Sequence, residues 1–165
     1  MMKQRRYGAL LLAVCLAAAL FCCGCEKKSG NTIEEPDITA EYLEEEYSQQ
    51  LLTDGAETMT GTISLKESND SYQIHIAEKE VVPSSRYKEG YYIADTNAEK
   101  DATVGANVRI AGNTDGEATV LTTEELEQAI SKDAEQLYTV YLMGDSAELI
   151  LSTDASELLD TSGTN

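Results

Sequence analysis

The stretch Leu137–Leu151, LYTVYLMGDSAELIL, decides the fold because it predicts a hairpin in the middle of a sheet. Gly144-Asp145 marks a tight turn between two short apolar runs. Both faces of the predicted strands, Leu137–Met143 and Ala147–Leu151, hold apolar side chains, as is typical of strands that are covered on two sides. We therefore predict that this hairpin is central and that the other elements assemble around it.

Strands with a single apolar face are predicted on the N-terminal side of this hairpin. Asn69-Asp70 separates two segments in which apolar and polar residues alternate, so these segments predict a second hairpin. The turn at residues 112–116, GNTDG, separates two more alternating segments. The predicted strands are Thr62–Lys66, Tyr72–Ala77, Tyr91–Ala94, Val104–Ile110 and Ala118–Leu121.

Two helices are predicted from a period near four residues. The first follows Thr39 as N-cap and ends at Gly55, with an apolar stripe on one side and acidic residues on the solvent side. The second spans Glu124–Gln136 and starts with a capping box, in which Thr122 precedes Glu125 by three residues. The stripes comprise Tyr42, Leu43, Tyr47 and Leu51 in the first helix, and Leu126, Ala129, Ile130 and Ala134 in the second; the acids are Glu41, Glu44, Glu45 and Glu46.

These elements predict an α+β domain over residues 38–160, followed by a disordered tail at 161–165. The predicted architecture is a bent antiparallel β-sheet with one packed helix, preceded by the N-terminal helix. The order of strands and helix resembles an OB-type barrel, and that resemblance rests on element order alone. An open antiparallel α+β sandwich is the alternative.

The N-terminal residues have the layout of a secretory signal. Met1–Arg6 is basic, Gly8–Phe21 is uninterrupted apolar sequence, and Gly24-Cys25 closes the run. This end of the chain resembles the lipobox of bacterial lipoproteins. The resemblance implies that residues 1–24 are removed and that Cys25 receives a diacylglycerol.

In that interpretation residues 25–37 are the lipidated cysteine and a flexible tether with a reach of about 20 Å. The protein then lies at the extracytoplasmic face of a cell membrane, anchored by lipid, with the membrane as a partner. An uncleaved membrane anchor stays open, since Tyr7–Gly24 has 18 residues, near the minimum that spans a bilayer.

Composition excludes several classes of function. The chain has 12 Lys+Arg against 30 Asp+Glu, a net charge of -18, which argues against nucleic-acid binding. The signal contains three of the bases and no acid, so the mature part has nine bases against 30 acids, a net charge of -21. One His and the absence of a mature thiol pair argue against zinc, haem and disulfides, and we expect no metal or cofactor. The four cysteines, Cys15, Cys22, Cys23 and Cys25, all lie at or before the cut.

Two polar features have ordinary structural explanations. His75 alternates onto the polar face of its strand, and no acid or nucleophile adjoins it in sequence, so we expect an exposed histidine that is not catalytic. The segment Asp95–Asp101 has oxygen-bearing side chains at alternate positions, as a calcium loop does. Lys100 stands where an EF-hand has Gly, and Ala106 where it has Glu, which favours an ordinary polar loop.

A tyrosine cluster is the candidate ligand patch. Tyr87, Tyr91 and Tyr92 lie near Arg86, and such a group can stack on a sugar or hold a peptide. The alternative is that these tyrosines serve as core and edge residues in a domain that lacks Phe and Trp. Without a recognised catalytic motif, the sequence favours a non-enzymatic module that binds an unidentified protein or envelope component. A small-ligand (sugar or peptide) binding lipoprotein and a hydrolase with an unrecognised carboxylate site are the alternatives.

Overall fold

The computed structural model describes residues 38–68, 71–114 and 117–161. The expected signal, Cys25 and the tether lie outside the described residues, as do the turn residues 69–70 and 115–116 and residues 162–165. The predicted central hairpin is confirmed, with β5 at Leu137–Met143 and β6 at Ser146–Thr153. Gly144 adopts a positive φ of 62° in its turn, a conformation that glycine adopts without steric cost.

Six strands form one mixed sheet in the order β2-β1-β5-β6-β3-β4, and β2 also pairs with β3. The strands β1, β2, β5 and β6 therefore each have two neighbours, and β3 has three. The expected all-antiparallel sheet is wrong at one pair, because β3 and β6 are parallel. Strand β4 runs opposite to β3, and the helix that follows β4 returns the chain so that β5 runs in the same direction as β4. Strand β6 is antiparallel to β5 and therefore runs in the direction of β3. The remaining strands are β1 (Glu57–Ser68), β2 (Ser71–Pro83), β3 (Tyr91–Thr114) and β4 (Glu117–Val120).

One strand, β3, replaces two predicted strands and the polar loop between them. The segment Asp95–Asp101 is part of β3, so the prediction of a loop is wrong there. A bulge interrupts the pairing, since the register with β2 shifts between Ala77 and Lys79. Asn97 takes a φ of 63° at this bulge, in the left-handed region that asparagine tolerates better than most residues. The bulge allows β3 to continue past the point where its polar residues predicted a loop.

Gly61 lies where β1 passes from one neighbour to the next. It pairs with Glu78 of β2 on one side and with Tyr138 of β5 on the other. A Cβ atom at this position would collide with the backbone carbonyl oxygen of Ala77. Glycine therefore permits a close approach of β2 that a side chain would prevent.

The inner hydrophobic cluster lies between the strands and helix α4 (Thr123–Lys132). The predicted capping box is present: the Thr122 hydroxyl accepts from the Glu125 N–H at 3.2 Å, and the Thr122 N–H donates to the Glu125 carboxylate at 2.8 Å. Leu126 on this helix is fully buried. The helix ends at Lys132, four residues earlier than predicted, so Ala134 is exposed and does not join the apolar stripe.

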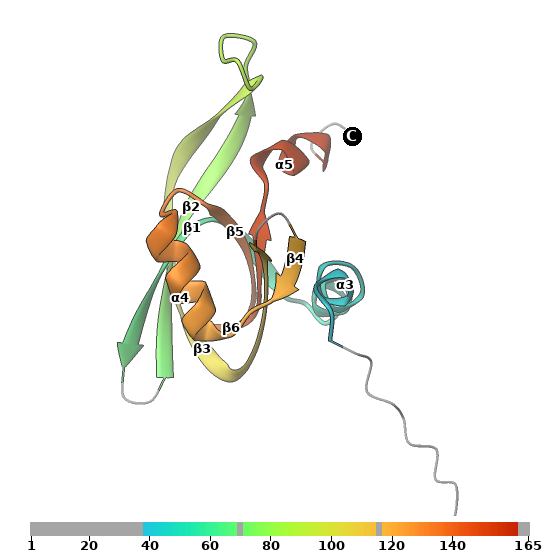
Figure 1. The fold of residues 1–165 in the computed structure, drawn as a ribbon, viewed down its shortest axis with the longest axis vertical. Helices are drawn as coiled ribbons and strands as arrows, with labels where there is room; N and C mark the ends of the chain where they lie inside the picture. Colours follow the sequence, from blue (N-terminus) through green and yellow to red (C-terminus); the bar gives the residue numbers. More distant parts are fainter. Residues whose placement is uncertain (1–37, 69–70, 115–116, 162–165) are drawn as a thin grey trace, which may run out of the picture. The chain divides into compact units, whose positions relative to one another are not determined.

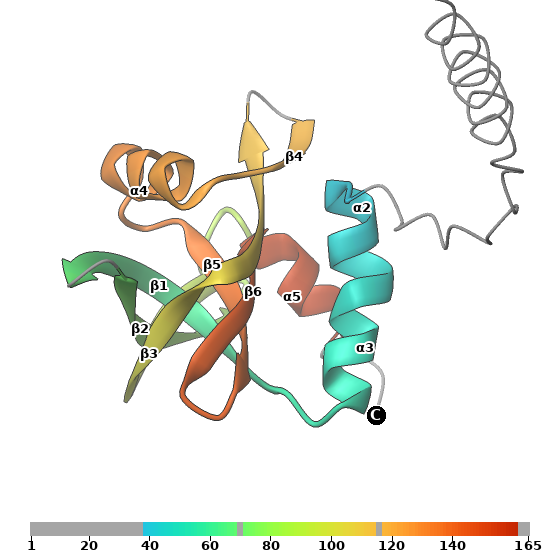
Figure 2. The same cartoon turned by 90° about the horizontal axis from the view of Figure 1, so that it is seen from below.

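The predicted N-terminal helix packs on the other side of the strands from α4 (Figure 2). It comprises α2 (Ala40–Tyr42), a π-helical turn η1 (Leu43–Tyr47) and α3 (Ser48–Thr53). Thr39 caps it, accepting from the Tyr42 N–H at 3.2 Å, and it ends before Gly55, whose φ is 94°. The outer hydrophobic cluster joins this helix to the sheet and contains Ala40, Leu43, Leu51, Ala111, Leu149 and Leu151.

A further helix, α5 (Ala155–Thr161), follows β6 and was not predicted. Its N-terminus is capped by Asp154, which accepts from the Ser156 N–H at 2.8 Å and from its hydroxyl at 2.7 Å. In Figure 1 α5 lies beside the projecting part of the β2–β3 hairpin, and it contacts β2. None of the helices in the described ranges is long and apolar enough to cross a bilayer.

Candidate functional site

An open groove of about 850 Å³ crosses the outer face of the central hairpin. Thr139 and Tyr141 of β5 and Thr153 of β6 line it. The side walls come from η1, β3 and β4, which are far away in sequence, and from α5, which directly follows β6. The volume lies within the range of about 300–1,000 Å³ that is usual for ligand sites.

The lining of the groove is acidic. Five carboxylates lie along it, and no Lys, Arg or His of the described residues does. The pKa of Glu44 is raised, mainly because its largely exposed carboxyl is partly desolvated and then by the nearby carboxylate of Glu157. Hydrogen bonds from Ser156 hold the pKa of Asp154 below its ordinary value. The lining of the groove therefore carries negative charge, and among the described residues the nearest cation of a neighbouring space is Lys132, which lines the adjoining cavity under α4. The acids of the groove are Glu44, Asp133, Glu135, Asp154 and Glu157.

A row of threonine hydroxyls crosses three strands next to the groove. Thr60 and Thr139 lie 3.0 Å apart between hydroxyl oxygens, and Thr139 and Thr153 lie 2.8 Å apart. The Gln136 side-chain amide donates to the carbonyls of Leu137 and Thr153 at 2.9 and 3.0 Å. These bonds link β1, β5 and β6 through side chains, so this part of the groove has a rigid polar floor.

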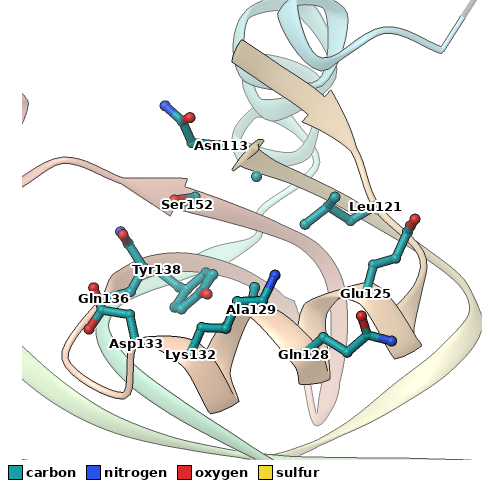
Figure 3. A pocket seen from close by; sticks show the side chains of 11 residues that line it. Asn113, Leu121, Glu125, Gln128, Ala129, Lys132, Asp133, Gln136, Tyr138 and Ser152 are labelled. Carbon is teal, nitrogen blue, oxygen red and sulfur yellow. The ribbon is translucent and has the colours of Figure 1, made fainter. Parts of the chain in front are cut away.

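A smaller cavity of about 410 Å³ adjoins the groove under α4 (Figure 3). Tyr138 of β5 and Ser152 of β6 face α4 across it, while Gln128, Ala129 and Lys132 of α4 line its other side. Burial, and to a smaller extent Asp133, raises the pKa of Tyr138. The cavity shares Gly112, Asn113, Asp133, Gln136 and Ser152 with the groove, so the two spaces adjoin each other.

The predicted tyrosine patch is divided between two places. Tyr87 and Tyr92 contact each other near the hairpin turn with tilted rings, whose centroids are 5.5 Å apart, and are 52% and 39% exposed. Tyr91 lies on the opposite face of β3 from Tyr92, is half-buried and lines the groove. Arg86 is exposed in the turn itself. The alternative of core and edge residues is therefore wrong for Tyr87 and Tyr92 as regards the core, while Tyr92 does lie in a part of β3 that pairs with β2 alone.

His75 has an acidic partner that its own strand does not reveal. Its Nδ1 lies 2.8 Å from Oδ1 of Asp101 on β3, and its Nε2 lies 4.0 Å from the Glu99 carboxylate. The expectation that His75 is exposed on a polar face is confirmed, with 43% of its side chain accessible. The sequence next to His75 supplies no such partner, whereas the β2–β3 register places Asp101 directly opposite it.

The calcium-loop pattern does not produce a ligand cage. Asp95 forms an ion pair with Lys79 instead, and Lys100 lies 3.1 Å from the Glu57 carboxylate. Within the described ranges, no group of three or more His, Cys, Asp or Glu side chains is arranged to hold a metal ion. The extended backbone of β3 points successive side chains to opposite faces, whereas a calcium loop directs its oxygens to one centre.

Sequence reasoning missed the groove because no linear motif contains it. Its residues come from five separate segments, and their spacing in sequence has no period. One sequence feature could have indicated the groove. Both faces of the central hairpin are apolar, so residues from elsewhere in the chain must pack against the second face. In comparisons with protein-family models, curated proteins and solved structures, no match to this chain was found.

Proposed function

We propose that this chain is a lipid-anchored extracytoplasmic binding protein that holds a basic peptide segment of another envelope protein in its acidic groove. The proposal rests on the groove of about 850 Å³, whose lining contains five carboxylates and no basic side chain of the described residues. Tyr91 and Tyr141 add aromatic surface to it. Lys and Arg side chains offer both the positive charge and the apolar stems that such a surface favours.

The proposed architecture of the binding module is a small barrel of the OB type. Three pairings support it: β1 with β5, β2 with β3, and the parallel pair β3 with β6. Together with the hairpin pairings they return from β1 through β2, β3, β6 and β5 to β1. Helix α4 precedes β5, as the helix does in the strand order that the sequence resembles. Fold alone does not identify a ligand, so the ligand proposal depends on the groove.

The anchor is proposed from the lipobox resemblance at Gly24-Cys25. A diacylglycerol supplies the two acyl chains that stable membrane attachment requires. Intact-mass measurement of the protein purified from membranes tests this directly. We expect a chain that starts at Cys25 with added acyl mass, and a chain that starts at Met1 without acyl mass would refute the anchor.

The preference for a cation follows from the charges around Glu44. Its raised pKa shows that burial and neighbouring carboxylates oppose its ionisation. A bound Lys or Arg side chain would offset that repulsion and would stabilise the ionised form. Binding of a basic peptide is therefore expected to weaken as the pH falls through the raised pKa of Glu44, because protonation removes the attraction while Lys and Arg stay charged.

Isothermal titration of the full chain with tetralysine at low salt tests the groove. We expect measurable binding of tetralysine and none of tetraglutamate. Removing one groove carboxylate, in Glu44→Gln or Glu157→Gln, should weaken binding up to about fivefold. Glu127→Gln is the matched control, because Glu127 is exposed on α4 and lines neither cavity. Equal losses in all three variants would mean that tetralysine responds to net charge alone and would contradict the proposal.

The hydrolase alternative predicts a pair of buried carboxylates that act together on a bound substrate. Among the residues that the structure describes, the buried polar side chains are Ser48 and Thr153. Glu44 has a raised pKa, but its side chain is exposed at the edge of the groove. A binding function is the one that the geometry supports.

A further inference from the structure

The β2–β3 hairpin projects as a two-stranded arm beyond the rest of the sheet (Figure 1). Pairing of β1 with β2 starts at Glu78, so the five residues Lys79–Pro83 pair only with β3. At about 3.4 Å per residue, this arm extends roughly 17 Å past the edge of β1. The turn and the adjacent strand end present Arg86, Tyr87, Lys88 and Tyr92, which we name the tip patch.

The turn that holds the tip patch is closed by its own backbone hydrogen bonds. The Ser84 N–H donates to the Gly90 carbonyl at 2.7 Å, and the Tyr87 N–H donates to the Ser84 carbonyl at 3.2 Å. The Gly90 N–H in turn donates to the Tyr87 carbonyl at 3.1 Å, with Gly90 at a φ of 83°. Because the turn satisfies its backbone internally, it presents Tyr87 to solvent in a defined position.

The tip patch combines exposed aromatic surface with unpaired positive charge. Tyr87 is 52% exposed, although an aromatic ring of this size is usually more buried. Lys79 and Lys100 on the same strands have carboxylate partners. Arg86 and Lys88 have none among the described residues. With Glu89 as the only acid of the turn, the tip has a net positive charge in a chain of net charge -18.

We propose that the tip patch contacts the anionic phospholipid surface of the membrane in which the protein is anchored; this inference rests on the proposed lipid anchor. Tyrosine has an apolar ring and a polar hydroxyl, so it is favoured at the boundary between headgroups and acyl chains. Arg and Lys beside it attract anionic headgroups, with each cation strengthening the attraction about fivefold. The anchor keeps the tip close to the membrane, so even a weak contact is populated.

The length of the arm explains how an acidic protein can touch an anionic surface. Electrostatic repulsion between exposed charges decays with a Debye length of about 8 Å at physiological ionic strength. The arm of roughly 17 Å places the edge of β1 about two Debye lengths away when the tip touches, whereas Glu157 of α5, which lies beside the arm, stays closer. The repulsion from the carboxylates beyond the edge of β1 is then largely screened.

Tryptophan fluorescence tests the contact, because the chain has no Trp of its own. The full lipidated chain with Tyr87→Trp is reconstituted into vesicles of phosphatidylcholine alone or with phosphatidylglycerol. We expect a blue shift of the emission in the phosphatidylglycerol vesicles only. Removing the two cations in Arg86→Gln with Lys88→Gln should abolish that shift. Val120→Trp is the matched control, since Val120 is 42% exposed on β4, away from the arm.

The outcomes separate this proposal from the anchor. Identical emission of Tyr87→Trp in both kinds of vesicle would overturn the membrane contact. A tip patch that binds another protein instead of the membrane would give this same result. An equal shift of Val120→Trp would overturn it too, because the whole domain would then lie on the surface. If the chain does not float with phosphatidylcholine vesicles, the anchor is refuted, and the emission with phosphatidylglycerol still decides the tip patch.

Discussion

The two faces of the β5–β6 hairpin are equally apolar in sequence but are covered differently. On the inner face Val140, Leu142 and Ile150 are at most 1% exposed, surrounded by the other strands and by α4. On the outer face the N-terminal helix buries Leu149 completely, while Tyr141 stays half-buried. One short helix covers only part of a sheet face, and the uncovered remainder is the groove. A groove thus arises where the cover of an apolar face ends.

The largest effect is expected from a cavity on the inner face. Ile150→Ala should lower the free energy of unfolding by about 2–5 kcal/mol, because strands on all sides prevent the site from collapsing. Urea denaturation followed by circular dichroism measures this. Met143→Ala, at a residue 39% exposed in the same hairpin, is the control and should cost far less. Similar losses in the two variants would mean that the inner face is not the better packed one.

A cavity on the outer face should lower the free energy of unfolding somewhat less than one on the inner face. Leu43→Ala is expected to lower the free energy of unfolding by about 2–3 kcal/mol, since a surface helix can shift to fill part of the space. Amide hydrogen exchange should accelerate in residues 40–53 while β5 and β6 stay protected. Leu52→Ala is the control, because Leu52 lies on the same helix but is 42% exposed. Faster exchange in β5 as well would show that the two clusters unfold as one.

Removing the N-cap of α4 tests how much this helix, which covers the inner cluster, contributes to the stability of the protein. Thr122→Ala should destabilise the protein by about 1 kcal/mol. Hydrogen bonds from Thr122 lower the pKa of Glu125 in the folded state, so their stabilising contribution exists above pH 4.5 and is lost as the pH falls through the lowered pKa. Thr122→Ala removes the hydroxyl bond to the Glu125 carboxylate and keeps the backbone N–H bond, so the destabilisation should be slightly larger at pH 7 than at pH 3. Thr123→Ala, one residue later, is the control, and a pH-independent loss in Thr122→Ala would contradict the role of Glu125.

The smallest effect concerns charge on the outer face. Because the pKa of Glu44 is raised above 4.5 in the folded protein, its ionisation opposes folding, and stability falls as the pH rises through the raised pKa. Glu44→Gln should therefore raise the melting temperature slightly at pH 7 and leave it unchanged well below pH 4.5. Glu127→Gln should show a weaker difference between the two pH values. A lower melting temperature of Glu44→Gln at pH 7 would contradict the expected repulsion.

Several elements were predictable because short-range interactions form them. Thr39 and Thr122 cap their helices through side chains that reach the next turn, and Gly144 supplies the positive φ of a hairpin turn. The capped start of α5 had the same kind of signal, Asp154 before Glu157, and was missed because its apolar content is only Leu158-Leu159. The parallel pairing of β3 with β6 and the contact of His75 with Asp101 had no local signal, since sheet register decides both.

The sequence by itself determined the capped helices, the turns and the alternation of apolar residues in the strands, since these depend on residues within a few positions of one another. It also determined the acidity of the protein and the lipobox resemblance at Cys25. Only the tertiary structure decided which faces are covered. Burial depends on what other elements leave open, and so the groove, the division of the tyrosine patch and the projecting tip emerged only once the strands were paired.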